Sequence, residues 1–181
     1  MQEGVSAADD AVIRPEPLRL LYRYWRGKSV AGQVPDRGAI EPSEIGGRLL
    51  PNVMLLDIDD TQRTLRYRLV GSAIARDYGR DFTGNALEQV IHPGQLDWVR
   101  ELYATARRER RAVYSESRYR LEHGYDRFTY RLYMPLRRGG AEVAMMLAGQ
   151  IYSEMPATAP PDFGVVVRTG DVVERTQALL P

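Results

Sequence analysis

The residues that could do chemistry in this chain are two histidines, a cluster of aspartates and a group of arginines, since the sequence contains no cysteine. A histidine can ligate haem iron or exchange a proton near neutral pH. His92 directly precedes Pro93, where a ring more often forms local hydrogen bonds at a helix start, and His123 falls in an expected hairpin turn. We therefore predict that neither histidine binds haem or a metal and that the protein holds no cofactor.

The aspartates Asp57, Asp59 and Asp60 stand together in the sequence DIDD. Paired carboxylates can bind a metal ion or act as general acid and base, but aspartate is also favoured in the tight turn expected here. The sequence contains no Ser–His–acid spacing, phosphate-binding glycine loop or HExxH motif, and the lack of cysteine excludes thiolate catalysis. We predict that the protein is not an enzyme.

Arginines gather at the end of the longest expected helix and on the strands that follow: Arg107, Arg108, Arg110, Arg111, Arg118, Arg120, Arg127 and Arg131. Basic side chains at a helix C-terminus complement its dipole, and strand arginines can pair with acids across a solvated face. The alternative is an adaptor surface that binds an anion or a nucleotide. The 25 basic and 24 acidic residues nearly cancel, so we expect no nucleic-acid partner.

The length and composition fit one globular domain. The chain has 181 residues, of which 44% are hydrophobic and 27% charged, enough for a core of its own. No apolar run approaches the roughly 20 residues of a membrane span, and the first residues, MQEGVSAADD, include no apolar block. We expect a cytoplasmic protein that does not bind membranes.

The periodicity of apolar residues, together with glycine and proline positions, predicts a single antiparallel sheet with helices on one face. A helix follows Pro15 and Pro17; strands are expected at 49–59, 64–70, 113–121, 127–136 and 143–152, a short helix at 86–91 and a longer one at 95–111. We expect 1–14 to be a disordered tail, 15–153 the domain, and 154–181 a Pro-rich linker and C-terminal tail in which a helix begins at Asp171.

The segment Arg66–Gly84 leads from the second strand into the helical part. Tyr67 and Leu69 alternate with arginines, as in a half-buried strand. Ser72 is expected to cap a short helix, and Gly79 to end it with the positive φ that glycine adopts readily. This segment is predicted to leave the sheet and fold back across it, forming the wall of a pocket.

The N-terminal helix carries an apolar stripe of Leu18, Leu21, Tyr22 and Trp25 at i, i+3, i+4 and i+7. The stripe can pack on the chain's own sheet or be shared with a second copy, because Tyr and Trp are frequent in protein interfaces. Both readings stay open; we predict a homodimer that uses these side chains.

Several motifs together resemble the PAS domain. They are LRLLYRYWRGK, PDRGAIEPSEI, LLPNVMLLDI, RYRLVGSAIARDYGRDFTG and the HP before the long helix, and the likeness covers roughly residues 18–152. The N-terminal motifs look like those of one compact bacterial PAS subfamily. The resemblance implies an α+β fold with a five-stranded antiparallel sheet and a flanking N-terminal helix. It also implies a sensory or regulatory module that binds a small molecule, a protein partner in trans, or both.

Side chains on the apolar face of the sheet and on the helices above it are expected to line a small pocket. The candidates are Tyr67, Leu69, Ile74, Tyr78, Leu87, Val90, Trp98, Tyr130, Leu132, Met145 and Leu147. Each can equally serve as core packing.

Overall fold

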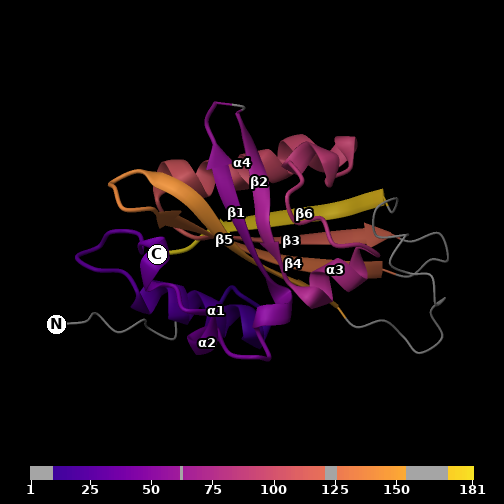
Figure 1. Ribbon diagram of the computed structural model, residues 1–181. Helices are drawn as coiled ribbons and strands as arrows, with labels where there is room; N and C mark the ends of the chain where they lie inside the picture. The colour runs from indigo at the N-terminus through magenta and orange to yellow at the C-terminus, as the bar shows by residue number, and fades with distance from the viewer. Residues whose placement is uncertain (1–9, 62, 121–125, 154–170) are drawn as a thin grey trace.

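The computed structural model describes residues 10–61, 63–120, 126–153 and 171–181 and shows an antiparallel sheet between helices (Figure 1). Within these residues the strands are β1 (Val53–Asp59), β2 (Thr64–Val70), β3 (Val113–Arg120), β4 (Asp126–Arg137), β5 (Val143–Tyr152) and β6 (Asp171–Leu179). They lie in the order β2-β1-β5-β4-β3-β6, and every neighbouring pair is antiparallel. The predicted α+β class is confirmed, with six strands in place of five.

The helical elements lie before β1, between β2 and β3, and nowhere else in the described part of the chain. They are α1 (Glu16–Gly27), α2 (Pro42–Ile45), α3 (Ser72–Asp77) and α4 (Pro93–Glu109), with 3-10 turns η1 (Arg37–Ala39), η2 (Leu50–Asn52) and η3 (Leu87–Gln89). The first strand begins later than predicted because Pro51 lies inside η2. None of the helices in the described segments is long and apolar enough to cross a membrane.

Two glycines shape the connection from β2 into α3. Gly71, not Ser72, is the N-cap residue of α3, and a Cβ at this position would lie 2.3 Å from the backbone oxygen of Pro51. The N–H of Gly71 donates to the carbonyl of Val53 at 2.8 Å. Gly79 follows α3 with a φ of 73°, as predicted. The chain can therefore turn directly over η2 because residue 71 has no side chain.

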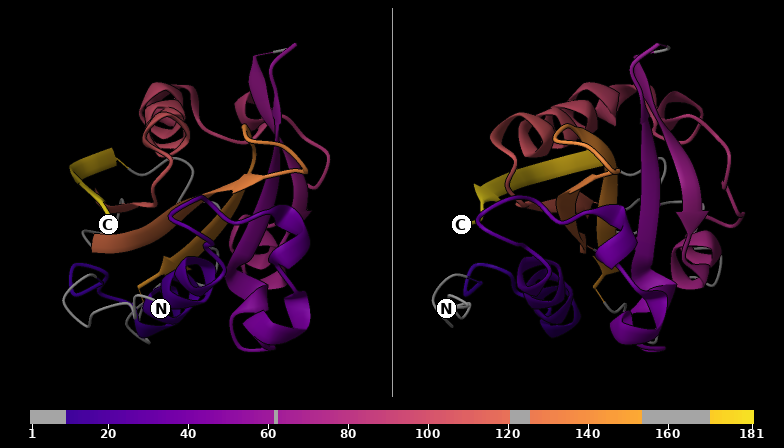
Figure 2. Two further views of the ribbon diagram at one scale, coloured as in Figure 1. Left: turned by 90° about the vertical axis from the view of Figure 1, so that its left-hand side faces the viewer. Right: turned by 60° about the vertical axis from the view of Figure 1, so that its left-hand side comes forward.

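α4 and α1 lie on opposite faces of the curved sheet (Figure 2). Tyr103 of α4 packs edge-to-face on Tyr133 of β4, with ring centroids 4.6 Å apart. On the other side, Leu18 and Leu21 of α1 pack so closely on Gly149 of β5 that a Cβ there would lie 2.7 Å from each side chain. We call the face under α4 the inner face and the face under α1 the outer face.

The apolar stripe of α1 is buried against the chain's own sheet. Leu18, Leu21, Tyr22 and Trp25 are each 2% exposed or less. The indole N–H of Trp25 donates to the carbonyl of Pro135 at 3.0 Å. The prediction that these four side chains form a dimer contact is wrong, because a side chain buried inside its own subunit has no surface left for a partner.

The N-terminal boundary also differs from the prediction. Ile13 is buried, and the carboxylate of buried Asp10 pairs with Arg23 at 2.6 Å. Residues 10–14 are therefore part of the packed domain rather than of a disordered tail, and residues 1–9 lie outside the described residues.

At the other end of the sequence, a helix was expected to begin at Asp171. The segment Asp171–Leu179 instead forms β6, which pairs with β3. The edge of β3 offers unpaired backbone groups, and a segment containing Val and Thr suits a strand. The N–H of Leu180 then donates to the carbonyl of Ala112 at 2.8 Å, and the Leu180 side chain is buried. The predicted linker before β6 lies in residues 154–170, which the structure does not describe.

Candidate functional site

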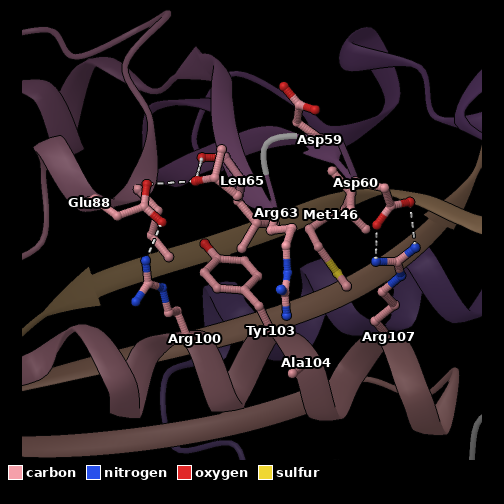
Figure 3. Close-up of a pocket in the computed structure, with 13 residues that line it drawn as sticks. Asp59, Asp60, Arg63, Leu65, Glu88, Arg100, Tyr103, Ala104, Arg107 and Met146 are labelled. Carbon is pink, nitrogen blue, oxygen red and sulfur yellow. Dashed lines mark hydrogen bonds and ion pairs between the residues drawn. The ribbon is translucent and has the colours of Figure 1, made fainter.

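A groove of about 540 Å³ lies between the β1–β2 hairpin, η3 and α4 (Figure 3). Its apolar floor is formed by side chains from every one of these elements and from β5, including Leu65, Leu87, Tyr103 and Met146. The volume falls within the roughly 300–1,000 Å³ that is usual for small-molecule sites. We call this hollow the hairpin groove.

Ion pairs close the two ends of the hairpin groove. Arg107 of α4 donates to both carboxylate oxygens of Asp60, at 2.6 and 2.8 Å. Arg100 donates to Glu88 at 2.6 Å, and the same carboxylate accepts from the hydroxyl of Thr64. The hydrogen bonds from Arg107 lower the pKa of the Asp60 carboxyl below its ordinary value. These contacts link α4 to the hairpin at one end and to η3 at the other.

Arg63 extends from the hairpin toward α4, between Tyr103 and Met146 (Figure 3). Its backbone has a φ of 53°, which is uncommon for a residue other than glycine. Within the described segments, no hydrogen bond or ion pair holds its guanidinium group. Arg63 is thus a positive charge directed into the groove, without an acidic partner among the described residues.

A second feature is a buried polar network on the inner face, which we call the Arg131 cluster: Tyr78, Tyr119, Arg131, Gln150 and Tyr152. Arg131 donates from Nε to Oε1 of Gln150 at 2.9 Å and from Nη2 to the hydroxyl of Tyr119 at 3.2 Å. Gln150 in turn donates to the hydroxyl of Tyr152 at 2.8 Å, and Tyr152 shares a hydrogen bond with Tyr78. Every acceptor in this cluster is a neutral group.

The positive charge of Arg131 is not balanced by a carboxylate among the described residues. Its side chain is 7% exposed, and the groups that act on it electrostatically are tyrosines. Burial raises the pKa of Tyr152 well above its ordinary value and that of Tyr133 to about 12, so these phenols are uncharged at neutral pH. A buried, unpaired charge costs several kcal/mol.

Two small cavities adjoin the Arg131 cluster, with volumes of about 10 and 20 Å³. Both are lined by Tyr78 and Arg131, and each has room for about one water molecule. Nearby on β3 and β4, the buried hydroxyls of Ser117 and Thr129 have no hydrogen-bond partner among the residues that the structure describes. Unsatisfied buried polar atoms are rare in native proteins and indicate a position for water or a ligand.

The predicted pocket residues divide between the two faces. Tyr67, Tyr78 and Val90 line the small cavities, and Leu87 lines the hairpin groove, so their role in ligand binding stays a prediction. Ile74 is buried in the core and Trp98 half-buried on α4, and neither lines these hollows.

The other five candidates were assigned to the wrong face. Tyr130, Leu132, Met145 and Leu147 alternate in register with Gly149, so they lie on the outer face with α1. Their neighbours along each strand, such as Arg131 and Tyr133, occupy the inner face instead. A shift of one residue along a strand exchanges the two faces.

Leu69 was misplaced for a different reason. Leu55 pairs with Leu69 but Leu56 pairs with Tyr67, so Arg68 is an extra residue in β2. Such a bulge reverses the alternation beyond it. Tyr67 is consequently buried while Leu69 is 44% exposed.

The remaining chemistry-bearing residues have structural roles. Nδ1 of His92, the N-cap residue of α4, accepts a hydrogen bond from the N–H of Gly94 at 3.2 Å, which confirms the predicted local contact. The hydroxyl of Thr61 donates to Asp59 at 2.6 Å, a contact within the predicted turn. His123 lies outside the described residues, among which no group of three acids or histidines could hold a metal ion.

The predicted arginine surface is not a continuous basic patch. Arg118 and Arg120 both donate to Asp126, which confirms the predicted cross-strand pairing, and Arg118 also contacts Glu174. Arg127 is buried, with its guanidinium 4.3 Å from the ring centre of Tyr152, so it does not lie on the solvated face predicted for it.

Solved structures of low sequence identity share parts of this arrangement. One is the PAS domain of a protein from Colwellia psychrerythraea, 13% identical, covering 55% of this chain and 82% of that chain with a TM-score of 0.41. Another is the PAS domain of BvgS from Bordetella pertussis, 21% identical, covering 59% and 80% with a TM-score of 0.44. A third is dimeric VqmA of Vibrio cholerae, 8% identical, covering 64% and 52% with a TM-score of 0.46.

No curated protein matches the sequence. Comparison with protein families matches residues 13–150 to the PAS domain. This match includes α1, the helical middle, strands β1 to β4 and most of β5, but not β6. Because it spans well over half of the sequence and agrees with the antiparallel sheet and its helices, the chain belongs to the PAS domain family.

Proposed function

We propose that the protein is a sensory or regulatory module, rather than an enzyme, that binds a small molecule in the hairpin groove. The observation that carries the proposal is a hollow of about 540 Å³ with an apolar floor and a charged rim. Ligand sites typically combine an apolar lining with a few polar groups that fix orientation. Membership of the PAS family supports a sensory role.

The groove favours a ligand with an apolar body and one anionic or carbonyl group. Leu65, Leu87 and Met146 would contact the apolar part, and Arg63 would donate to the oxygen. Arg63 is the natural partner for such a group, because Arg100 and Arg107 are already engaged by Glu88 and Asp60.

The same rim provides a route from ligand binding to a change in shape. The ion pair between Arg107 and Asp60 and that between Arg100 and Glu88 are partly exposed, so each contributes about 0–1 kcal/mol. A ligand that replaces one of them can move the hairpin relative to α4 and alter the surface offered to a protein partner in trans. A homodimer would have to use a surface other than the α1 stripe, since that stripe is buried.

The test is native mass spectrometry of protein purified without denaturation and then screened against small amphipathic acids and amides. Ala104→Trp fills the groove from α4, while Glu101→Trp places the same ring at an exposed position of that helix that does not line the groove. We expect a bound molecule in the wild type and in Glu101→Trp, and its loss in Ala104→Trp. Ligand retention by Ala104→Trp, or no ligand for the wild type, would rule out the groove.

A further inference from the structure

We propose that the cavity between Arg131, Tyr78 and the start of α4 binds a small monovalent anion of halide size. The cavity is distinct from the hairpin groove. Val90, Ile91, His92, Gln95 and Tyr119 complete its lining, and none of these residues borders the groove.

The first argument is charge. A guanidinium remains protonated throughout the physiological range, so Arg131 carries its charge into the interior. The partners that the structure gives it, Gln150 and Tyr119, are neutral, and no carboxylate in the described segments pairs with it. Charged side chains buried to this degree are almost always paired in native proteins. A single monovalent anion beside the guanidinium of Arg131 would balance its charge.

The second argument is the supply of hydrogen-bond donors. Arg131 has five N–H groups, of which the contacts to Gln150 and Tyr119 use two. Its remaining N–H groups are available to the adjoining cavities, both of which Arg131 lines. Tyr78 lines both cavities and shares a hydrogen bond with Tyr152, so its hydroxyl lies beside the same space.

The position of α4 adds to this field. His92, the N-cap residue of α4, and Gln95 in its first turn both line the cavity. The N-terminus of a helix carries a partial positive charge that favours an anion. The helix and the guanidinium therefore act in the same direction on whatever occupies the cavity.

Size limits the anion. The cavity of about 20 Å³ has room for about one water molecule, which excludes phosphates, nucleotides and larger carboxylic acids. A water molecule can satisfy hydrogen bonds there but cannot neutralise the charge. A halide, which is close to a water molecule in size, can do both.

The experiment measures thermal unfolding in sodium bromide and in sodium chloride. Ionic strength is held constant with sodium sulfate, whose anion is too large for the cavity. Arg131→Gln removes the charge, and Arg120→Gln is the matched control, because Arg120 is exposed and paired with Asp126. Above the dissociation constant, the folding equilibrium constant of the wild type should rise about tenfold for each tenfold increase in anion. Arg120→Gln should respond in the same way and Arg131→Gln should not.

A second measurement does not depend on whether Arg131→Gln folds. Wild-type crystals grown in bromide should show an anomalous peak within hydrogen-bond distance of the Arg131 guanidinium. Such a peak, together with stabilisation by bromide, supports the proposal. If the midpoint responds to neither anion and a water molecule occupies the position, the proposal is overturned.

Discussion

The packing of α1 on the outer face makes Trp25→Ala a sharp test of how the N-terminal helix is used. Trp25 is 2% exposed, and truncating a buried tryptophan to alanine costs about 3–5 kcal/mol. The substitution also leaves the buried carbonyl of Pro135 without its indole donor, a loss of about 1–3 kcal/mol. A domain of this kind has roughly 5–15 kcal/mol of stability in total, so one side chain removes a large part of it.

Urea unfolding and sedimentation equilibrium should be measured together on the same samples. Leu21→Glu, which places a carboxylate at a buried position, should unfold the protein as well. Leu20→Ala is the control, because Leu20 lies on the same helix but is exposed, and its substitution should change stability by no more than about 0.5 kcal/mol. If Trp25→Ala and Leu21→Glu are instead folded monomers with the wild-type unfolding midpoint, the stripe belongs to a dimer interface and the docking of α1 described above is incorrect.

Two further predictions concern the backbone and the buried phenols. Gly71→Ala should cost about 3 kcal/mol because its Cβ would meet backbone atoms of Pro51, whereas Gly79→Ala, which meets no atom within 4 Å, should cost only the roughly 1–2 kcal/mol of a positive φ. Equal shifts in their urea midpoints would contradict this. Burial holds the pKa of Tyr133 at about 12 against an ordinary 10.0, so above pH 10 the unfolded chain loses this proton first and stability falls as pH rises. The full loss is about 3 kcal/mol, and Tyr133→Phe should flatten the dependence. A difference in tyrosinate absorbance between the wild type and Tyr133→Phe that appears near the ordinary pKa with the fold intact would refute it.

The order of the elements could be predicted from the sequence because breakers separate them. Asp59 and Asp60 mark the first hairpin, and Gly71 and Gly79 bound the short helix between β2 and the rest of the helical middle. These signals are local, since they depend on what one residue's backbone can adopt. The PAS resemblance depended on the same local motifs, and the family match agrees with it.

The face of each strand could not be predicted in the same way. Met145 and Met146 are neighbours on β5, point to opposite faces, and are both 0% exposed. A strand covered by α4 on one side and α1 on the other has no solvent side, so a period of two carries no information about which face holds a pocket. The error over Tyr130, Leu132, Met145 and Leu147 followed from placing helices on one face only.

The tail illustrates a competition between local and tertiary signals. Asp171 and Glu174 have the spacing of a capping box, which indicated a helix. The structure instead pairs this segment with β3, where Glu116 lies opposite Thr176 and Tyr114 opposite Ala178. The free edge of β3 is formed by residues more than fifty positions away, so no pattern within the tail itself predicts the pairing with β3.

The candidate site was the part of the structure that the sequence predicted least well, because its polar residues are buried where their pattern indicated solvent exposure. In β4, Arg127, Thr129 and Arg131 alternate with apolar residues, a pattern that normally places the arginines in solvent. The structure turns the polar set inward beneath α4 and buries it. Replacing buried ionic groups with apolar residues of similar volume is often neutral or stabilising, so stability alone does not explain Arg131 and its tyrosines. Within the described part of the chain, Arg131 has no acidic partner and two buried hydroxyls have no hydrogen bond, which is the arrangement that the proposed anion would complete.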